Sequence, residues 1–420
     1  MEFPKVVLVR QNTNHSSISD IPAVVRKELQ EINLASRVCK GQKIAITAGS
    51  RGIANIVVIT KTIVQELKAL GVESFIVPAM GSHGEATPEG QIEVLNALGI
   101  EEKSVGAPII SSLEVVQIGT TETGVPVWID KNSANADGII LINRVKPHTE
   151  FNAPIESGLM KMMVIGLAKH KGATIAHNHF VKQGYGNAIP VIAREVMKNS
   201  KILFGLATVE NSSHQTASIK AVLPSDIESV EKNMLVEAKR LMARLPFNNL
   251  DVLVVSEMGK QICGTGMDPN VIGRVYSQTE RDFPSPQITR IAVLDLTEES
   301  HGNAIGIGLA DFTTKNLVNK INYNATYINC LTGVTPEKAK IPITCDNDRD
   351  AISKALLTSG TNPQEAELVW IKNTLDLDVF YISVSLLEKI KSNPSIEILS
   401  EILDLPFNEH NNLVPWKPIH

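Results

Sequence analysis

The chain has 420 residues, of which 43% are hydrophobic, 20% charged and 4% aromatic, and its formal net charge at pH 7 is −5. A chain of this length exceeds what one core usually organises, so two domains are expected, and the composition is ordinary for a globular enzyme. The acidic balance, the lack of a long basic run and the few aromatic side chains argue against nucleic acid and anionic membrane as partners.

The predicted elements alternate between short apolar strands and helices. The strands are predicted over 43–47, 73–78, 127–129, 138–143 and 202–209, and the helices over 56–70 and 88–98. The helical segments carry apolar residues at a spacing of three and four, and Thr87 stands where an N-cap is expected. This repetition of strand, loop and helix predicts an α/β fold with a mostly parallel sheet covered by helices.

The pattern pauses around 245–249 and restarts with strands over 252–255 and 291–296. We therefore predict two α/β domains, each with a mostly parallel sheet: an N-terminal catalytic domain over 1–247 and a C-terminal domain over 248–404. The tail over 405–420 is rich in proline and is expected to wrap over the surface and return to the first domain.

Polar motifs follow most of these strands. They are Ser50-Arg51, His83, the segment 144–148, the segment 257–260 and His301. Because ligands gather where the strands of a parallel α/β sheet end, this agreement predicts an active site in a cleft between the two domains.

The segment Gly49-Ser50-Arg51-Gly52 offers backbone amides, a hydroxyl and a guanidinium, which suit a phosphate or carboxylate. A tight connection between strand and helix is the alternative interpretation. The segment matches neither the dinucleotide-binding glycine pattern nor the P-loop.

Two histidines stand in loops with possible roles in proton transfer. His83 has small neighbours, so a substrate could approach its imidazole, although a surface-loop histidine would look the same. His148 follows Pro147, and repulsion from Arg144 and Lys146 favours its neutral form, which can act as a general base. A phosphate-facing loop with an incidental histidine is the alternative.

Lys161 lies in an otherwise apolar segment, so it either reaches out to water or is a nucleophile. The run Lys169-His170-Lys171 is predicted to be a solvated helix end. His177 and His179 would share a face of an extended segment but diverge on a helix, so one metal ligand from the pair is more plausible than two.

The remaining features concern location and metal sites. The N-terminus, Met1 to Lys5, lacks the pattern of a secretion signal, and no apolar stretch reaches transmembrane length. The four cysteines show no paired spacing, which argues against a zinc or iron–sulfur site. A reduced, cytoplasmic setting is therefore expected.

Taken together, these motifs resemble the lactate racemase family, the nickel-pincer-nucleotide-dependent racemases and epimerases of 2-hydroxy acids. The resemblance is strongest from Arg51 to His179. It implies that Arg51 binds the substrate carboxylate and that His83 and His148 are opposed acid/base residues. Lys260 of the second domain is expected to assist Arg51 with the carboxylate or the developing oxyanion.

The segment from Ser157 to Lys161 matches the Ser-Gly-x-x-Lys segment whose lysine holds the family's cofactor covalently. That cofactor is a pyridinium thioamide/thiocarboxylate mononucleotide that presents carbon and two sulfurs to nickel. A histidine completes a square-planar site, with His177 as the first choice and His179 as the alternative. The residues expected to bind the cofactor are Lys161, Ser50, Arg51, Ser157 and Gly158.

The resemblance implies an isomerase in which hydride leaves the substrate α-carbon for the cofactor and returns to the other face. The family's prototype has an aspartate where Ala48 stands, and the stretch between His148 and Lys161 is longer here. The segments 144–148 and 264–269 also look like those of a divergent subgroup, and the positive charge added by Arg144 and Lys146 would suit a dicarboxylate or a sugar acid.

The expected partners are a 2-hydroxy acid substrate and the enzymes that synthesise the cofactor, with a homodimer as one assembly that the sequence allows. Two other classes of function compete with the hypothesis of a racemase or epimerase. An NAD-type oxidoreductase would need a glycine fingerprint that the sequence lacks. A non-catalytic small-molecule-binding protein would keep the fold without the chemistry.

Overall fold

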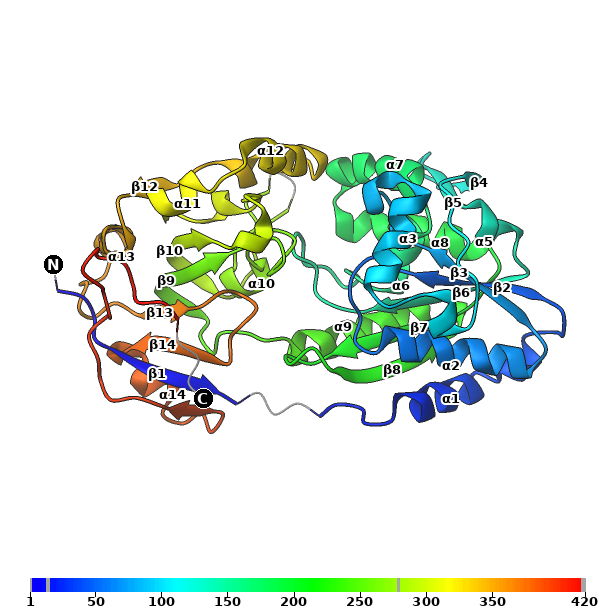
Figure 1. Cartoon of the computed structure of the whole chain (residues 1–420), viewed down its shortest axis with the longest axis horizontal. Helices are drawn as coiled ribbons and strands as arrows, with labels where there is room; N and C mark the ends of the chain where they lie inside the picture. Colours follow the sequence, from blue (N-terminus) through cyan, green and yellow to red (C-terminus); the bar gives the residue numbers. More distant parts are fainter. Residues whose placement is uncertain (1, 13–15, 278–279, 417–420) are drawn as a thin grey trace. The chain divides into compact units, whose positions relative to one another are not determined.

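The computed structural model describes residues 2–12, 16–277 and 280–416, and the chain forms two compact units. The N-terminal unit comprises His15–His148 and Asn152–Met242. The C-terminal unit comprises Met1–Asn14, Thr149–Phe151 and Ala243–His420. In each unit helices flank a sheet of its own (Figure 1).

The N-terminal unit is built on a sheet with the strand order β3-β2-β6-β7-β8. The first four strands in this order are parallel, and β8 pairs with β7 in the antiparallel direction. The carboxyl ends of β2, β3, β6 and β7 therefore meet at one edge of the sheet. The strands are β2 (Lys43–Ala48), β3 (Glu73–Pro78), β6 (Gly138–Arg144), β7 (Ile202–Glu210) and β8 (Thr216–Val222).

Alternate residues of these strands point to opposite faces, so one face of the sheet makes a continuous apolar core. Ile44 and Ile46 of β2 pack there against Ile59 and Ile63, which are one helical turn apart. The helices are α1 (Ile21–Glu31), α2 (Ile56–Ala69), α3 (Pro88–Ala97), α4 (Glu102–Val105), α5 (Lys131–Asn135), α6 (Leu159–Lys161), α7 (Lys169–Gln183), α8 (Tyr185–Asn199) and α9 (Ile227–Leu241). Short helical turns are η1 (Leu34–Ser36), η2 (Gly84–Ala86), the π-helical η3 (Met162–Gly166) and η4 (Pro224–Asp226).

A separate antiparallel pair, β4 (Val115–Thr120) and β5 (Pro126–Asp130), lies outside the main sheet of this unit. The predicted strand over 127–129 is therefore present, but it belongs to this hairpin. Its length and its Pro126 suit a short edge element, because proline cannot donate a ladder hydrogen bond.

The C-terminal unit has a sheet in the order β12-β11-β10-β9-β13-β14-β1-β15, parallel from β12 to β13 and antiparallel beyond. Its strands are β1 (Val6–Gln11), β9 (Asn249–Met258), β10 (Gln287–Leu296), β11 (Phe312–Thr314), β12 (Ile343–Cys345), β13 (Leu368–Ile371), β14 (Val379–Ser383) and β15 (Ile396–Ile398). Its helices are α10 (Pro269–Ile272), α11 (Lys315–Asn319), α12 (Tyr323–Thr332), α13 (Asp348–Leu357) and α14 (Leu387–Ile390). Shorter turns are η5 (Glu298–Ser300), η6 (Ile307–Leu309), η7 (Pro336–Ala339) and η8 (Val384–Leu386).

Both faces of this larger sheet are apolar, as expected for a sheet covered on both sides. Leu253 and Val255 of β9 contribute to the core on one face, whereas Val252 and Val254 contribute to the core on the other. Within the described parts of the chain, no helix combines the length and the apolar character that crossing a bilayer requires.

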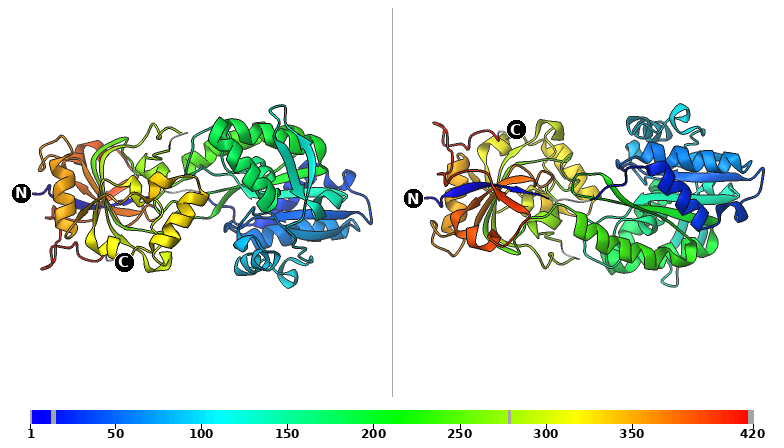
Figure 2. Two further views of the ribbon diagram at one scale, coloured as in Figure 1. Left: turned by 90° about the horizontal axis from the view of Figure 1, so that it is seen from above. Right: turned by 90° about the horizontal axis from the view of Figure 1, so that it is seen from below.

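The N-terminal strand departs from the predicted domain division, which placed everything up to residue 247 in the first domain. The apolar run of β1 pairs with β14 on one side and β15 on the other, with Val7 opposite Ile382. Figures 1 and 2 show this blue strand beside the orange and red strands of the C-terminal unit. The segment is thus placed by long-range strand pairing, which no local sequence pattern reveals.

The C-terminal tail also differs from the expectation that it returns to the first domain. Leu405 and Leu413 enter a core of the C-terminal unit, and the ring of Trp416 packs on Trp370 with centroids 5.2 Å apart. Burial of these apolar side chains holds the tail on the nearer sheet. The last part of the predicted tail, 417–420, lies outside the described residues.

The α/β class with mostly parallel, helix-flanked sheets is confirmed. The predicted elements agree closely with the observed ones: β3 spans Glu73–Pro78, and α3 spans Pro88–Ala97. The Thr87 side chain accepts a hydrogen bond from the Gly90 amide at 3.0 Å, as an N-cap should.

Candidate functional site

Three loops at the carboxyl edge of the N-terminal sheet carry the predicted catalytic side chains. Ser50 and Arg51 follow β2, His83 lies in the loop after β3, and His148 lies in the loop after β6. The structure brings two of these loops into contact, because the Ser50 hydroxyl is hydrogen-bonded to Nδ1 of His83. The Arg51 side chain beside them is exposed.

The His83 loop has a backbone that needs glycine at two positions. Gly81 and Gly84 have φ angles of +61° and +66°, in the left-handed region. A side chain at Gly84 would also collide with the first turn of α3, since its Cβ would lie 2.6 Å from the Gly90 carbonyl carbon. These close approaches seat the loop directly on α3.

The His148 loop is held by a neighbouring acidic residue. The His148 amide donates to Oε2 of Glu156 at 2.6 Å, and the other oxygen of this buried carboxylate accepts from Lys239 on α9. Only 8% of His148 is exposed. Glu156 thus holds the backbone of this loop, and the His148 imidazole is largely buried.

A short antiparallel bridge joins the His148 loop to the predicted cofactor segment. The backbone of Lys146 exchanges hydrogen bonds with Ser157, at 2.9 and 3.3 Å. This bridge places the start of α6 beside the loop, and Nζ of Lys161 contacts Nε2 of His148. Two side chains predicted from sequence to act together are therefore adjacent.

The segment before Lys161 has no room for a larger residue at Gly158. A Cβ there would lie 2.5 Å from the carboxylate of Glu231, which projects from α9. Glu231 accepts a hydrogen bond from the Met160 amide at 3.0 Å, and the Gly158 carbonyl accepts one from Asn143 at 2.7 Å. Burial raises the pKa of Glu231 to about 7, although backbone hydrogen bonds oppose the shift.

Glu231 is one of the residues that the sequence motifs did not indicate. It lies more than seventy positions after the segment that it supports, within a helix of ordinary amphipathic pattern. A buried acid at an inward position of that helix was the only local signal.

Arg144 does not act on His148 in the way the sequence suggested. Its guanidinium forms an ion pair with Glu210 at the end of β7, and Glu210 also accepts from the Ala54 amide at 2.8 Å. The positive charge of Arg144 is therefore largely compensated. Arg144 therefore contributes little to keeping His148 neutral, and little to binding a substrate with an additional carboxylate.

The alternatives for the nickel ligand, His177 and His179, both lie on helix α7. Two positions correspond to about 200° of rotation, so the two side chains leave the helix on different faces. The ring of His177 lies near Tyr185, with centroids 6.1 Å apart, and the ring of His148 lies near the same tyrosine at 6.0 Å. His177 and His148 thus share a neighbouring ring, and the choice of the nickel ligand stays a prediction.

Tyr185 was not singled out from the sequence. It begins α8 directly after Gly184, whose φ of +78° lets the chain turn between α7 and α8. The tight turn places the phenol ring near both histidines, and also 4.7 Å from the ring of Phe180. The Gly184-Tyr185-Gly186 sequence was the available signal for this turn.

Lys260 belongs to the other unit, where it follows β9. Its amide donates to the Ser300 hydroxyl at 3.0 Å, and its ammonium group contacts the Asn329 side chain. Its expected role toward the substrate stays a prediction.

Lys169 corrects an expectation, since it is fully buried and not part of a solvated helix end. Its neighbours His170 and Lys171 are exposed as predicted. Burial lowers the pKa of Lys169, and the nearby Asp130 carboxylate opposes this shift. The first residue of α7 is thus turned inward, while the next two are exposed, with the Lys171 ammonium 3.6 Å from the centroid of the Trp128 ring.

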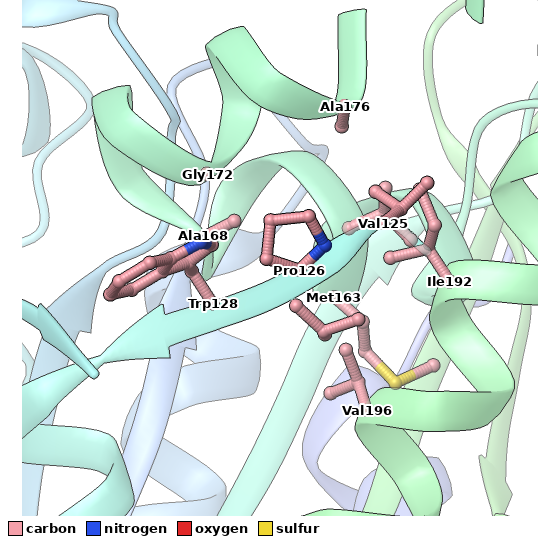
Figure 3. Close-up of a pocket in the computed structure, with 11 residues that line it drawn as sticks. Val125, Pro126, Trp128, Met163, Ala168, Gly172, Ala176, Ile192 and Val196 are labelled. Carbon is pink, nitrogen blue, oxygen red and sulfur yellow. The ribbon is translucent and has the colours of Figure 1, made fainter. Parts of the chain in front are cut away.

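A small pocket lies between β5 and helices α7 and α8, as Figure 3 shows. Its lining is apolar, with Trp128 and Pro126 on one side and Met163 and Ile192 on another. None of the predicted catalytic residues is among the side chains that line it. Its mostly apolar lining has the character of an imperfectly filled core.

Metal ligands in the described residues do not gather in one place. No group of three or more histidine, cysteine, aspartate or glutamate side chains there is arranged to hold a metal ion. A metal bound near His177 would therefore depend on donors that are not protein side chains.

Comparisons with known proteins match the N-terminal part of the chain to a family and the fold to a solved structure. Residues 4–188 match the family described as the lactate racemase N-terminal domain, a range that includes every predicted site residue except Lys260. The solved structure of the lactate racemase apoprotein from Thermoanaerobacterium thermosaccharolyticum is similar, with a TM-score of 0.55 and 14% sequence identity over 89% of this chain and 99% of that one. No curated protein matches the sequence. At this identity the structural likeness shows a common fold.

Proposed function

We propose that the protein is a racemase or epimerase of a 2-hydroxy acid, because residues 4–188 match the family of the lactate racemase N-terminal domain. The observation that carries this proposal is the contact between the His148 imidazole and the Lys161 amine. These two groups lie at the same sheet edge as His83. Two imidazoles on separate loops and one lysine amine are the groups that the proposed reaction requires.

The donor set fits the nickel-pincer nucleotide that the family resemblance implies. Lys161 offers a primary amine for covalent attachment, and His177, whose ring shares the neighbour Tyr185 with His148, offers a single imidazole for nickel. A single protein ligand suffices for a metal whose other donors come with the cofactor. When bound, this group would supply a carbon that accepts hydride from the substrate and returns it.

The side chains of the protein would handle the proton and the carboxylate. A neutral imidazole of His83 or His148 would accept the proton of the substrate hydroxyl, and the opposite histidine would return one after inversion. The exposed guanidinium of Arg51 would bind the carboxylate through two parallel hydrogen bonds. The Ser50 hydroxyl would hold the His83 ring in a fixed orientation.

The decisive experiment uses full-length protein from a host that makes the pincer cofactor. Peptide mass spectra and nickel analysis should show a nucleotide adduct on the Lys161 peptide together with bound nickel. The same protein should convert single enantiomers from a panel of 2-hydroxy monocarboxylates, hydroxy dicarboxylates and sugar acids into mixtures, as seen by chiral chromatography.

Lys161→Ala should lose both the adduct and the activity. Lys182→Ala, at an exposed lysine of α7, is the matched control and should keep both. An unmodified Lys161 without nickel, from a host that loads a control racemase, would overturn the proposal and favour a binding protein that has kept the fold.

A further inference from the structure

A chain of buried polar side chains supports the His83 loop from beneath. Gln91, on α3, is fully buried, and its side-chain amide donates to two carbonyls of the loop. The acceptors are the carbonyls of Gly81 at 3.1 Å and His83 at 3.2 Å. Both N–H groups of this one amide are thus used to fix the loop on either side of Ser82.

The ammonium group of Lys169 extends this support. It donates to Oε1 of Gln91 at 3.4 Å and to the carbonyl of Pro78, the last residue of β3. It also lies 3.5 Å from Oδ2 of Asp130, which is equally buried. A single cation therefore connects the end of β3, the amide that holds the loop, and a carboxylate on β5.

Asp130 is itself fixed, so the network has a rigid base. Its Oδ1 accepts from the amide of Ser133 at 2.7 Å and from the Ser133 hydroxyl at 2.9 Å. Its Oδ2 has no hydrogen-bond partner in the described residues, which leaves the Lys169 charge to compensate it. A buried charge without such compensation would be costly.

The backbone at Lys169 adopts a strained conformation, and its side chain points toward Gln91 and Asp130. Its φ is +55°, a left-handed conformation that a lysine rarely adopts. Strain of this kind persists only where the surroundings enforce it, and it occurs often at functional sites. At Lys169 it turns the side chain inward, while α7 continues toward His177 two turns later.

We propose that Lys169 and Gln91 are positioning residues that hold His83 in place through the Pro78, Gly81 and His83 carbonyls. This inference rests on the proposed function, because only then is His83 a catalytic base that Lys169 and Gln91 support. Its geometry stands on the contacts of the chain alone. Residues near the start of α3 and α7 thereby fix a loop that follows β3.

The test measures the loop itself in the full-length protein without cofactor. Amides of the loop are hydrogen-bonded in the structure, such as His83 to Met80 at 3.1 Å and Ala86 to Ser82 at 3.1 Å, so their hydrogen exchange is slowed. Exchange of the peptide over 79–86 reports the order of the loop. The side-chain NMR signal of His83 reports the environment of its ring.

Two variants remove the support in different ways. Gln91→Leu keeps the size of the side chain but removes both donors. Lys169→Met combined with Asp130→Asn removes the cation without leaving the carboxylate charged. Asn96→Leu on α3 and Lys182→Met on α7, both at exposed positions, are the matched controls.

In Gln91→Leu the Gly81 and His83 carbonyls lose their donor, and in the double variant the Pro78 carbonyl and the Gln91 side-chain oxygen lose theirs. In both variants exchange over 79–86 should therefore rise about tenfold or more. The His83 signal should shift, while exchange over 157–166 and both controls stay at parent values. A folded Gln91→Leu protein with parent exchange and an unchanged His83 signal would overturn the inference.

Racemisation assays of the same variants separate the inference from the proposed function. If the loaded parent protein racemises a hydroxy acid, loss of His83 placement should lower kcat by about tenfold or more with little change in KM. If the parent protein shows no racemisation, the proposed function fails, and the exchange measurements still decide whether Lys169 and Gln91 hold the loop.

Discussion

The His83 loop and the segment before Lys161 both carry predicted site residues, and they are supported by different chemistry. The His83 loop rests on a buried ion pair and an amide, so that Lys169 and Gln91 together meet three backbone carbonyls. The segment before Lys161 rests on Glu231, a buried carboxyl that accepts from a backbone amide and whose Oε1 has no hydrogen-bond partner in the described residues. The first support pairs the charge of Lys169 with that of Asp130, whereas in the second Glu231 is held by a backbone hydrogen bond.

The two supports should respond differently to mutation and to pH. The Lys169–Asp130 pair fails when either partner is removed alone, because the other charge is then stranded in the core. Glu231 avoids a stranded charge by staying protonated up to a pKa of about 7. The His83 support is therefore sensitive to mutation, and the Lys161 support is sensitive to pH.

The largest effect is expected for Lys169→Met. It leaves the buried Asp130 without its counterion and should lower the free energy of unfolding by about 3–5 kcal/mol. Adding Asp130→Asn should recover most of this loss, because the stranded charge is removed. Urea unfolding measures both values. Lys182→Met, at an exposed position of the same helix, should change the stability little, and an equal loss there would contradict the comparison.

The second effect is a pH dependence that belongs to Glu231. Since burial raises its pKa from 4.5 to about 7 in the folded protein, the folded state binds more protons than the unfolded state between these values. Stability from this group is therefore present below pH 4.5 and is lost as the pH rises to about 7, by roughly 3 kcal/mol in total. The neighbouring Glu228 adds to the shift by repulsion.

Glu231→Gln keeps the acceptor for the Met160 amide but cannot ionise, so it should flatten this pH dependence. Unfolding temperatures between pH 5 and pH 8 measure the difference. Glu237→Gln on the same helix is the control and should leave the slope as it is in the parent protein. A slope unchanged in Glu231→Gln would show that other groups produce it.

A third effect tests the close fit between Gly158 and Glu231. The φ of Gly158 is 174°, so an alanine could adopt the backbone, and the obstacle is the carboxylate 2.5 Å from its Cβ. Gly158→Ala should cost about 1–3 kcal/mol of unfolding free energy through this overlap. Gly52→Ala, where a Cβ would meet Leu98 only at 3.9 Å, is the control and should change stability little.

The overlap can be assigned to Glu231 by a double-mutant cycle. If the overlap causes the loss, combining Gly158→Ala with Glu231→Ala should cost less than the sum of the two single changes, by about 0.5–3 kcal/mol. Simple additivity would place the strain elsewhere in the segment.

The contrast between the two supports also explains which parts of the site the sequence could reveal. The positions of His83, His148 and Lys161 could be predicted because each follows a recognisable strand or a glycine-marked segment. Their neighbours at the sheet edge follow from the parallel order of the strands. Local pattern and topology together were sufficient for this part.

The supports themselves could not be predicted, because they depend on contacts between distant segments. Glu231 meets Met160 across 71 positions, and Lys169 meets Pro78 across 91. In sequence Lys169 stands in a charged run, and only its left-handed backbone turns it inward. The same reason applies to β1, which completes a sheet whose other strands lie more than 230 residues later.

The smallest effect concerns the helix that carries Gln91. Thr87 caps α3 by accepting from the Gly90 amide at 3.0 Å, and its hydroxyl also donates to the Gly84 carbonyl at 3.2 Å. Thr87→Ala should cost about 1 kcal/mol, and Thr87→Ser should retain most of the stability because its hydroxyl makes the same bonds. Hydrogen exchange should quicken over 84–91 and stay unchanged over 157–161, because the two supports share no residue. Equal losses in the alanine and serine variants would show that the methyl group, and not the cap, stabilises this helix.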